Sequence, residues 1–196
     1  ITGFGAVVNC AKVKPLSSVV VVGVGGVGLN AIQGAAFSGA YPIIAVDMVD
    51  SKLKSARAFG ATHMVNAAKE KDPPKAVRQL TSGRGADYVI VTVGSTAAVR
   101  QGFSMSGRRG MTVIVGLATE SPTISPMEFI DGERILTGCF MGTTNLSIDV
   151  PKLVTLYQAG QLKLDELITA RYSLEQINEA IESVEKGKEL RNVIMF

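Results

Sequence analysis

The chain has 196 residues, of which 46% are hydrophobic and 19% are charged. This composition excludes a disordered chain, because disorder requires low hydrophobicity and high net charge. The net charge is only +3 and the basic residues are scattered, so neither a nucleic-acid partner nor a membrane surface is indicated. No apolar run approaches the roughly 18 residues that a membrane-spanning helix needs.

Cysteine and histidine are rare in this sequence. Its two cysteines, Cys10 and Cys139, are widely separated, and His63 is its single histidine. The cysteines predict neither a disulfide framework nor a metal knuckle, which indicates a reducing, cytoplasmic location. With so few ligands, the chain is not expected to bind zinc on its own. It begins Ile1-Thr2, without methionine or a signal-like segment, which predicts a piece of a longer protein.

Strands and helices alternate along the first two thirds of the chain. Short aliphatic runs, most of them ending near glycine or aspartate, predict six strands at 19–22, 43–46, 64–65, 88–91, 113–115 and 135–141. Helical spacing of apolar residues predicts helices at 31–39, 51–60 and 73–80. The alternation favours an α/β fold with a doubly wound, six-stranded parallel sheet of the Rossmann type.

The pattern changes after about Gly142. Apolar spacing predicts a helix over 150–159 and a second one that starts at Ser173, where Glu175 or Gln176 would complete a capping box. Residues 192–196 are typical of a strand. The sequence therefore divides into two parts. Residues 1–142, which contain the glycine-rich turn at 23–28, are expected to form a dinucleotide-binding domain, and residues 143–196 a C-terminal helical tail.

One glycine-rich turn carries a chemical signal. The segment Gly23-Val24-Gly25-Gly26-Val27-Gly28 follows a predicted strand and opens a helix, and Asp47 ends the next strand roughly 20 residues later. In such a turn Gly23 permits the tight bend, Gly25 lets a pyrophosphate approach the backbone, and Gly28 lets helix and strand pack closely. The helix start offers N–H groups to phosphates. Asp47 would accept hydrogen bonds from ribose hydroxyls and repel a 2′-phosphate, which favours NAD over NADP.

Two other nucleotide-binding families fit less well. S-adenosylmethionine enzymes usually carry an acid two residues before the first glycine, where this chain has Val21. Short-chain dehydrogenases need a Tyr-x-x-x-Lys pair. No tyrosine of this chain has a lysine four positions later.

Several segments together resemble the medium-chain, zinc-dependent alcohol dehydrogenases, and the resemblance extends over the whole chain. They are Thr2-Gly3-Phe4-Gly5-Ala6, the glycine turn at 22–28, Gly60-Ala61-Thr62-His63, Val150-Pro151-Lys152-Leu153 and Arg191-Asn192-Val193-Ile194. The family's GroES-like N-terminal half, with its Gly-His-Glu segment and most zinc ligands, has no counterpart here. The resemblance implies the C-terminal, cofactor-binding part of such an enzyme, with residues 143–196 returning toward the other half.

The resemblance also implies individual cofactor contacts. Thr2 would lie beside the nicotinamide and Val27 would back its ring. Asp47 and Lys52 would hold the adenosine ribose, and Arg191 would reach the pyrophosphate. The complete set of expected NAD contacts is Thr2, Gly23, Gly25, Gly26, Val27, Gly28, Asp47, Lys52, Val93, Val115, Cys139, Met141 and Arg191, of which the backbones of Val115, Cys139 and Met141 would bind the carboxamide.

The implied reaction is hydride transfer between an alcohol, or an aldehyde adduct, and NAD, with zinc acting as a Lewis acid in the full-length enzyme. No residue of this chain is assigned a catalytic role, so we expect it to bind NAD without turnover. The alternatives are a stand-alone NAD-binding or sensor module and a zinc-free NADPH reductase of the same superfamily, against which Asp47 argues. The sixth strand resembles the edge that joins family subunits, which implies a homodimer or tetramer. The final strand is expected to be exposed, mobile or paired with another molecule.

Overall fold

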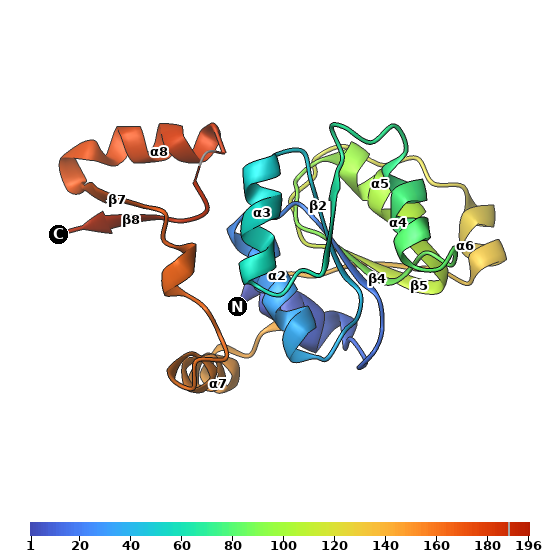
Figure 1. Ribbon diagram of the computed structural model, residues 1–196, viewed down its shortest axis with the longest axis horizontal. Helices are drawn as coiled ribbons and strands as arrows, with labels where there is room; N and C mark the ends of the chain where they lie inside the picture. Colours follow the sequence, from blue (N-terminus) through green and yellow to red (C-terminus); the bar gives the residue numbers. More distant parts are fainter. Residues whose placement is uncertain (188) are drawn as a thin grey trace.

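The computed structural model describes residues 1–187 and 189–196. Its main sheet has six parallel strands in the order β3-β2-β1-β4-β5-β6, with helices on both faces (Figure 1). This is the order of a doubly wound Rossmann sheet, so the predicted fold class is confirmed. The strands are β1 (Val19–Val22), β2 (Ile43–Asp47), β3 (His63–Asn66), β4 (Ala86–Val91), β5 (Ser106–Ile114) and β6 (Ile135–Gly138).

The valine run of β1 shows why the sheet needs helices on both sides. Val19 and Val21 lie in an apolar cluster with residues of α2 and α3, whereas Val20 and Val22 lie in a second cluster with residues of α4 and α5. Successive side chains of a strand point to opposite faces, so a strand covered on both faces needs an apolar residue at every position. The covering helices are α2 (Gly26–Phe37), α3 (Asp50–Ala58), α4 (Pro73–Leu80) and α5 (Thr96–Met105).

Helix α5 is not predicted by the sequence analysis, because glycine disfavours a helix interior. Gly102 is required by packing instead. A Cβ atom at this position would lie 2.7 Å from Cγ2 of Val91, so only glycine lets α5 approach β4 this closely. Ser95 caps the helix by accepting a hydrogen bond from the backbone N–H of Ala98. Strand β5 is also longer than the predicted 113–115, because its polar first half pairs with β4.

The N-terminal residues and one later segment form further helices outside the prediction. The first residues form α1 (Thr2–Gly5), which continues into a π-helical turn, η1 (Ala6–Ala11). A later helix, α6 (Pro126–Gly132), packs against β5 and carries a complete capping box between Ser125 and Glu128. No helix in the described residues is long and apolar enough to cross a bilayer.

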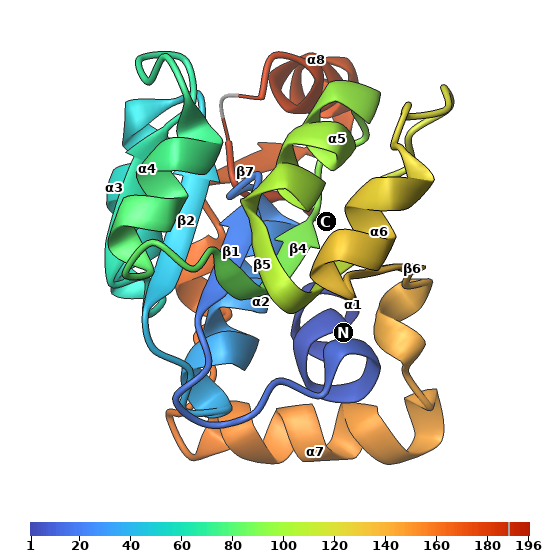
Figure 2. The same cartoon turned by 90° about the vertical axis from the view of Figure 1, so that its right-hand side faces the viewer.

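The C-terminal residues form one long helix and a small separate sheet. Helix α7 (Leu146–Gln158) runs beside α1, as Figure 2 shows. After the short turn η3 (Asp165–Leu167), β7 (Ala170–Ser173), the turn η4 (Leu174–Gln176), α8 (Ile177–Glu185) and β8 (Asn192–Met195) follow. The predicted capping box of Ser173 and Gln176 is present. We call β7, η4, α8 and β8 with their connecting loops the C-terminal lobe (Figure 1).

Strand β8 has a partner within its own chain. It pairs in parallel with β7, and the register joins Arg171 to Val193 and Tyr172 to Ile194. From the sequence, the final strand is expected to be exposed, mobile or paired with another molecule, whereas one of its edges is paired within the same chain. The reason is non-local: β7 is a short polar segment that becomes a strand only because β8 returns to it.

A hydrogen-bonded pair fixes the register of the two central strands. The carboxylate oxygen Oδ2 of Asp87 accepts hydrogen bonds from the backbone N–H of Ser18, at 2.8 Å, and from its hydroxyl, at 2.6 Å. The Ser18 hydroxyl in turn accepts from the backbone N–H of Asp87 at 2.9 Å. Ser18 is buried, so these groups have no solvent to replace a lost partner.

Replacing Asp87 with alanine is expected to lower the free energy of unfolding by about 1.5–3 kcal/mol, because it leaves the buried amide of Ser18 unpaired. Urea denaturation followed by circular dichroism measures this change. Asp131→Ala removes an exposed carboxylate from α6 and serves as the control. Equal midpoints for the two variants would contradict the assignment.

Candidate functional site

A crevice lies at the carboxyl ends of the central strands. It has a volume of about 430 Å³, and four of the residues that the sequence singles out line it: Gly23, Asp47, Lys52 and Val93. Strand β1 has β2, the next strand in the sequence, on one side and β4 on the other. In open α/β sheets, ligands bind at this switch point, where neighbouring connections diverge to opposite sides.

The glycine turn has the shape that a dinucleotide needs. Gly23 has a φ of +87°, a conformation that side chains disfavour. A Cβ atom at Gly28 would lie 1.9 Å from the carbonyl oxygen of Gly23, so glycine is obligatory where α2 meets β1. A Cβ atom at Gly25 would meet nothing within 4 Å, so its backbone faces open space. A pyrophosphate fits this cradle at the N-terminus of α2.

Asp47 is held in a fixed orientation at the end of β2. Its Oδ2 accepts a hydrogen bond from the backbone N–H of Val24 at 2.9 Å, and its Oδ1 accepts one from the backbone N–H of Val49 at 3.0 Å. The first bond joins the carboxylate directly to the glycine turn. A carboxylate has about four lone-pair sites, so Asp47 keeps acceptor capacity for a further donor in the crevice.

The neighbouring carboxylate is occupied elsewhere. Asp50 accepts hydrogen bonds from Lys69 and Asn66, and these bonds lower the pKa of Asp50 below its ordinary value. Of these two acidic residues, only Asp47 lines the crevice.

The C-terminal lobe brings a cation to the glycine turn. A Cβ atom added to Gly26 would lie 2.9 Å from the carbonyl oxygen of Leu190 and 3.5 Å from Nη2 of Arg191, so both residues lie close to this glycine. A Cβ atom on Gly187 would lie 3.3 Å from Nζ of Lys52. The loop between α8 and β8 therefore lies against both the turn and α3, and it places Arg191 beside the phosphate cradle.

The sequence analysis does not identify Thr169, which supports this loop. Its Oγ1 accepts hydrogen bonds from the backbone N–H groups of Leu190, at 2.9 Å, and Arg191, at 3.4 Å. Its own N–H donates to the carbonyl of Arg191 at 3.1 Å. No local sequence signal reveals this role, because the partners are more than twenty residues away. A second unidentified residue, Thr92, donates its hydroxyl to the carbonyl of Gly23 at 2.7 Å.

Three predicted contacts that are far apart in the sequence, Thr2, Val27 and Met141, lie near one another beyond the glycine turn. A Cβ atom on Gly3 would lie 1.9 Å from the carbonyl oxygen of Val27, so α1 packs tightly on α2. A Cβ atom on Gly142 would lie 2.9 Å from the carbonyl oxygen of Thr2. This brings Thr2 and Val27 close to the turn that contains Met141.

The remaining predicted contacts follow the ends of β4, β5 and β6. The backbone N–H of Val115 donates to the carbonyl of Val91, and that of Cys139 donates to Ile114. Cys139 is buried, as expected of a small core residue. Val93 packs against Gly23. A Cβ atom added to Gly23 would lie 2.2 Å from Cγ2 of Val93. Val93, Val115 and Cys139 thus follow the carboxyl ends of neighbouring strands.

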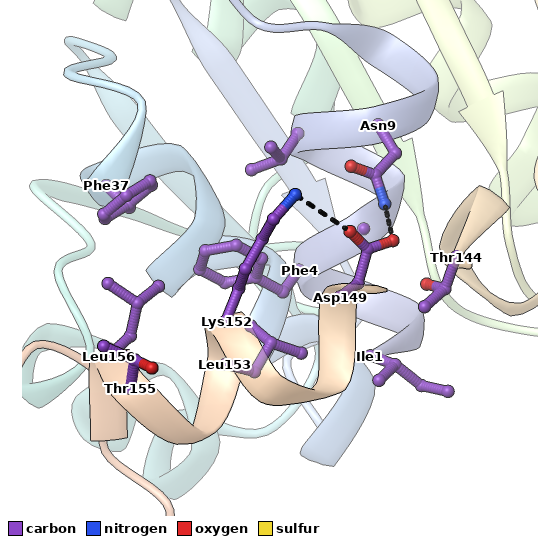
Figure 3. Close-up of a pocket in the computed structure, with 12 residues that line it drawn as sticks. Ile1, Phe4, Asn9, Phe37, Thr144, Asp149, Lys152, Leu153, Thr155 and Leu156 are labelled. Atoms are coloured by element: carbon purple, nitrogen blue, oxygen red, sulfur yellow. Dashed lines mark hydrogen bonds and ion pairs between the residues drawn. The ribbon is translucent and has the colours of Figure 1, made fainter. Parts of the chain in front are cut away.

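A second cavity, of about 390 Å³, lies between α1, α2 and α7 (Figure 3). Its walls are mostly apolar, and none of the predicted cofactor contacts lines it. Three of its polar side chains contact each other: Asn9 donates to Asp149 at 3.3 Å, and Lys152 lies 3.7 Å from the same carboxylate. The hydroxyl oxygen of Thr144, which also lines the cavity, is buried without a hydrogen-bond partner among the described residues.

The described residues contain no group of three or more His, Cys, Asp and Glu side chains placed to hold a metal ion. Cys10 and Cys139 are free thiols. The residues that could hold a cofactor are those of the crevice and of the glycine turn beside it.

Comparisons with known proteins agree with this geometry. Residues 26–159 match the family described as zinc-binding dehydrogenase. The chain is 40% identical over 201 residues to the NDMA-dependent alcohol dehydrogenase of Amycolatopsis methanolica, covering 99% of this chain and 53% of that protein. It is 38% identical to alcohol dehydrogenase 1 of Pisum sativum, covering 98% of this chain and 51% of that one.

Solved structures give the same result. The alcohol dehydrogenase zinc-binding domain protein from Burkholderia ambifaria superposes with a TM-score of 0.94 at 35% identity, over 100% of this chain and 52% of that one. Benzyl alcohol dehydrogenase from Acinetobacter calcoaceticus gives 0.93 at 34% identity, over 98% and 53%. The chain spans about half the length of these relatives. It belongs to the zinc-binding dehydrogenase family and corresponds to the C-terminal, cofactor-binding part of medium-chain, zinc-dependent alcohol dehydrogenases.

Proposed function

We propose that this chain is the coenzyme-binding part of an NAD- and zinc-dependent alcohol dehydrogenase. The observation that carries the proposal is the carboxylate of Asp47, which the backbone N–H groups of Val24 and Val49 hold at the edge of the crevice. A fixed carboxylate accepts hydrogen bonds from two ribose hydroxyls and repels a 2′-phosphate. This arrangement supports NAD over NADP.

The rest of the site supports one orientation of the coenzyme. The phosphates would lie on the glycine turn, where the N-terminus of α2 carries a partial positive charge and Arg191 adds a full one. Lys52 would join Asp47 at the ribose. The nicotinamide would then lie beyond the turn, next to Thr2 and Val27. Its carboxamide would meet the backbones of Val115, Cys139 and Met141.

The chemistry of the whole protein follows from its relatives. NAD supplies a hydride acceptor when it is bound, and the chain supplies proximity and orientation. We propose an alcohol or aldehyde-adduct substrate, since the relatives are named as alcohol dehydrogenases. The zinc ligands would come from outside this chain, which would bind NAD without turnover.

Residues 1–142 would form the coenzyme domain, and 143–196 would return toward the zinc-bearing part. The cysteine usage of the sequence favours the cytoplasm.

Replacing Asp47 with alanine tests the coenzyme assignment. We expect NADH to bind roughly 10- to 100-fold more weakly, because hydrogen bonds to a charged group are lost. We also expect the preference for NADH over NADPH to shrink, because the repulsion of the 2′-phosphate is lost. Fluorescence titration with both coenzymes measures these changes.

Asp50→Ala is the matched control for Asp47→Ala, since its carboxylate is engaged by Asn66 and Lys69. NADH affinity should be nearly unchanged in this variant. A wild-type preference for NADPH would instead favour a zinc-free reductase, and no binding of either coenzyme would refute the proposal.

Thr169 is proposed to position Arg191 at the pyrophosphate. Thr169→Val keeps the shape of the side chain but removes the acceptor for the N–H groups of Leu190 and Arg191. We expect NADH affinity to fall about 3- to 10-fold, in line with the loss of neutral hydrogen bonds. When Thr169→Val is added to the Arg191→Ala variant, the further loss of NADH affinity should be small, because both residues act through the guanidinium of Arg191. Additive losses in this double-mutant cycle would contradict the positioning role.

We propose that two copies of the chain associate through β6, as a homodimer or as half of a tetramer. Strand β6 is one of the two edge strands of the main sheet. Ile135 at its start is exposed, and so is Phe140, two residues after its end. An uncovered edge readily pairs with another strand, and a charged residue on it opposes such pairing. We therefore expect Ile135→Lys to shift the protein toward the monomer in sedimentation experiments. Leu16→Lys, in the loop before β1, should leave association unchanged, and a wild-type monomer at micromolar concentration would contradict the proposal.

A further inference from the structure

The two cysteines lie next to each other in the folded chain. Cys10 belongs to η1, and its Sγ donates to the carbonyl of Gly138, the residue before Cys139, at 3.9 Å. Cys10 thus contacts the residue that precedes Cys139, and the two cysteines belong to the same apolar cluster. Their separation in the sequence therefore does not carry over to space, and the sequence analysis misses this pairing.

The two thiols differ in exposure. Both cysteines belong to one apolar cluster, in which Cys139 is a buried core member and Cys10 a partly buried neighbour. Oγ1 of Thr143 lies 3.6 Å from Sγ of Cys139. Of the two thiols, only that of Cys10 is open to a reagent from solution.

Burial, and then the neighbouring Cys139, raise the pKa of Cys10 above its ordinary value. The thiolate is the reactive form of cysteine, so exchange at Cys10 is slow at neutral pH. Disulfide formation at this pair is therefore expected to be slow at neutral pH and faster at mildly alkaline pH.

We propose that Cys10 and Cys139 form a reversible dithiol–disulfide site whose oxidation weakens coenzyme binding at the adjacent nicotinamide end of the crevice. The oxidant is a low-molecular-weight disulfide. The Cys10 thiolate attacks one of its sulfurs, which forms a mixed disulfide and releases one thiol. The Cys139 thiolate then attacks the Cys10 sulfur, so that the protein disulfide forms and the second thiol leaves. Two protein thiols are oxidised and one reagent disulfide is reduced.

The geometry links this site to the coenzyme. A disulfide holds its two sulfur atoms about 2.05 Å apart, whereas Cys10 and Cys139 are free thiols whose sulfur atoms are not at bonding distance. Closing that gap pulls η1 and the segment after β6 toward each other. Cys139 supplies one of the backbones proposed for the carboxamide, so its displacement disturbs that contact. This second part of the inference rests on the proposed function, whereas disulfide formation does not.

Disulfide formation is tested by incubating the reduced protein with oxidised glutathione at mildly alkaline pH, followed by intact mass analysis and thiol titration under denaturing conditions. We expect wild type to lose two hydrogens in mass and both titratable thiols, with a peptide that links Cys10 to Cys139. Cys139→Ser should stop at the glutathione adduct of Cys10. Cys10→Ser should stay unmodified, because Cys139 is buried. A wild type that keeps both thiols, or stops at the adduct, would overturn the proposal.

Coenzyme coupling is tested by titrating the reduced and oxidised proteins with NADH. We expect several-fold weaker binding to the oxidised form and full recovery after dithiothreitol. The variant that carries both Cys10→Ser and Cys139→Ser should be insensitive to the oxidant. Equal affinities of the two wild-type forms would overturn the coupling. A disulfide that forms in a protein unable to bind NADH in either state would refute the proposed function and leave the disulfide site standing.

Discussion

The close approach of α2 to the end of β1 is the constraint on which the site depends. At Gly28 the carbonyl of Gly23 occupies the space of a side chain, and this contact fixes the start of α2 against the end of β1. The same turn donates the N–H of Val24 to Asp47, so the helix start and the carboxylate are fixed relative to each other. A similar contact, between Gly3 and the carbonyl of Val27, joins α1 to α2. Backbone packing rather than long side chains thus sets the positions of the polar groups.

Charged groups of both signs lie in and near the crevice. Asp47 and Lys52 line it, and the described residues contain no ion pair between them. Arg191 lies beside the glycine turn, outside the residues that line the crevice. Under the proposed function, the cations and the start of α2 would attract a diphosphate, and Asp47 would repel a 2′-phosphate.

Local signals made much of this arrangement predictable. The valine run of β1, the glycine turn and the acid that ends β2 all lie within about 30 residues, the length of one βαβ unit. Residues contributed from elsewhere in the chain, such as Thr2 and Arg191, were predicted only through the resemblance to a family.

Other features depend on contacts that no local pattern encodes. Helix α5 contains a glycine that lowers helix propensity but fits against β4. Strand β7 forms because β8 returns to it, and Thr169 acquires its partners from the same return. The contact between Cys10 and Gly138, next to Cys139, likewise requires η1 and the end of β6 to pack together. Each of these is set by the tertiary fold, which explains why reading the sequence segment by segment misses them.

The loop between α8 and β8 belongs to a lobe outside the main sheet, yet it lies on the glycine turn and beside Lys52. A diphosphate held there would touch two separately folded parts of the chain at once. Part of its binding free energy would be used to fix the lobe against the sheet. Occupancy of the crevice would then restrict the position of α8 and of whatever packs on its exposed apolar side chains, Ile181 and Val184 among them. Loading of the coenzyme and closure of the surrounding protein would be one coupled event, rather than two independent ones.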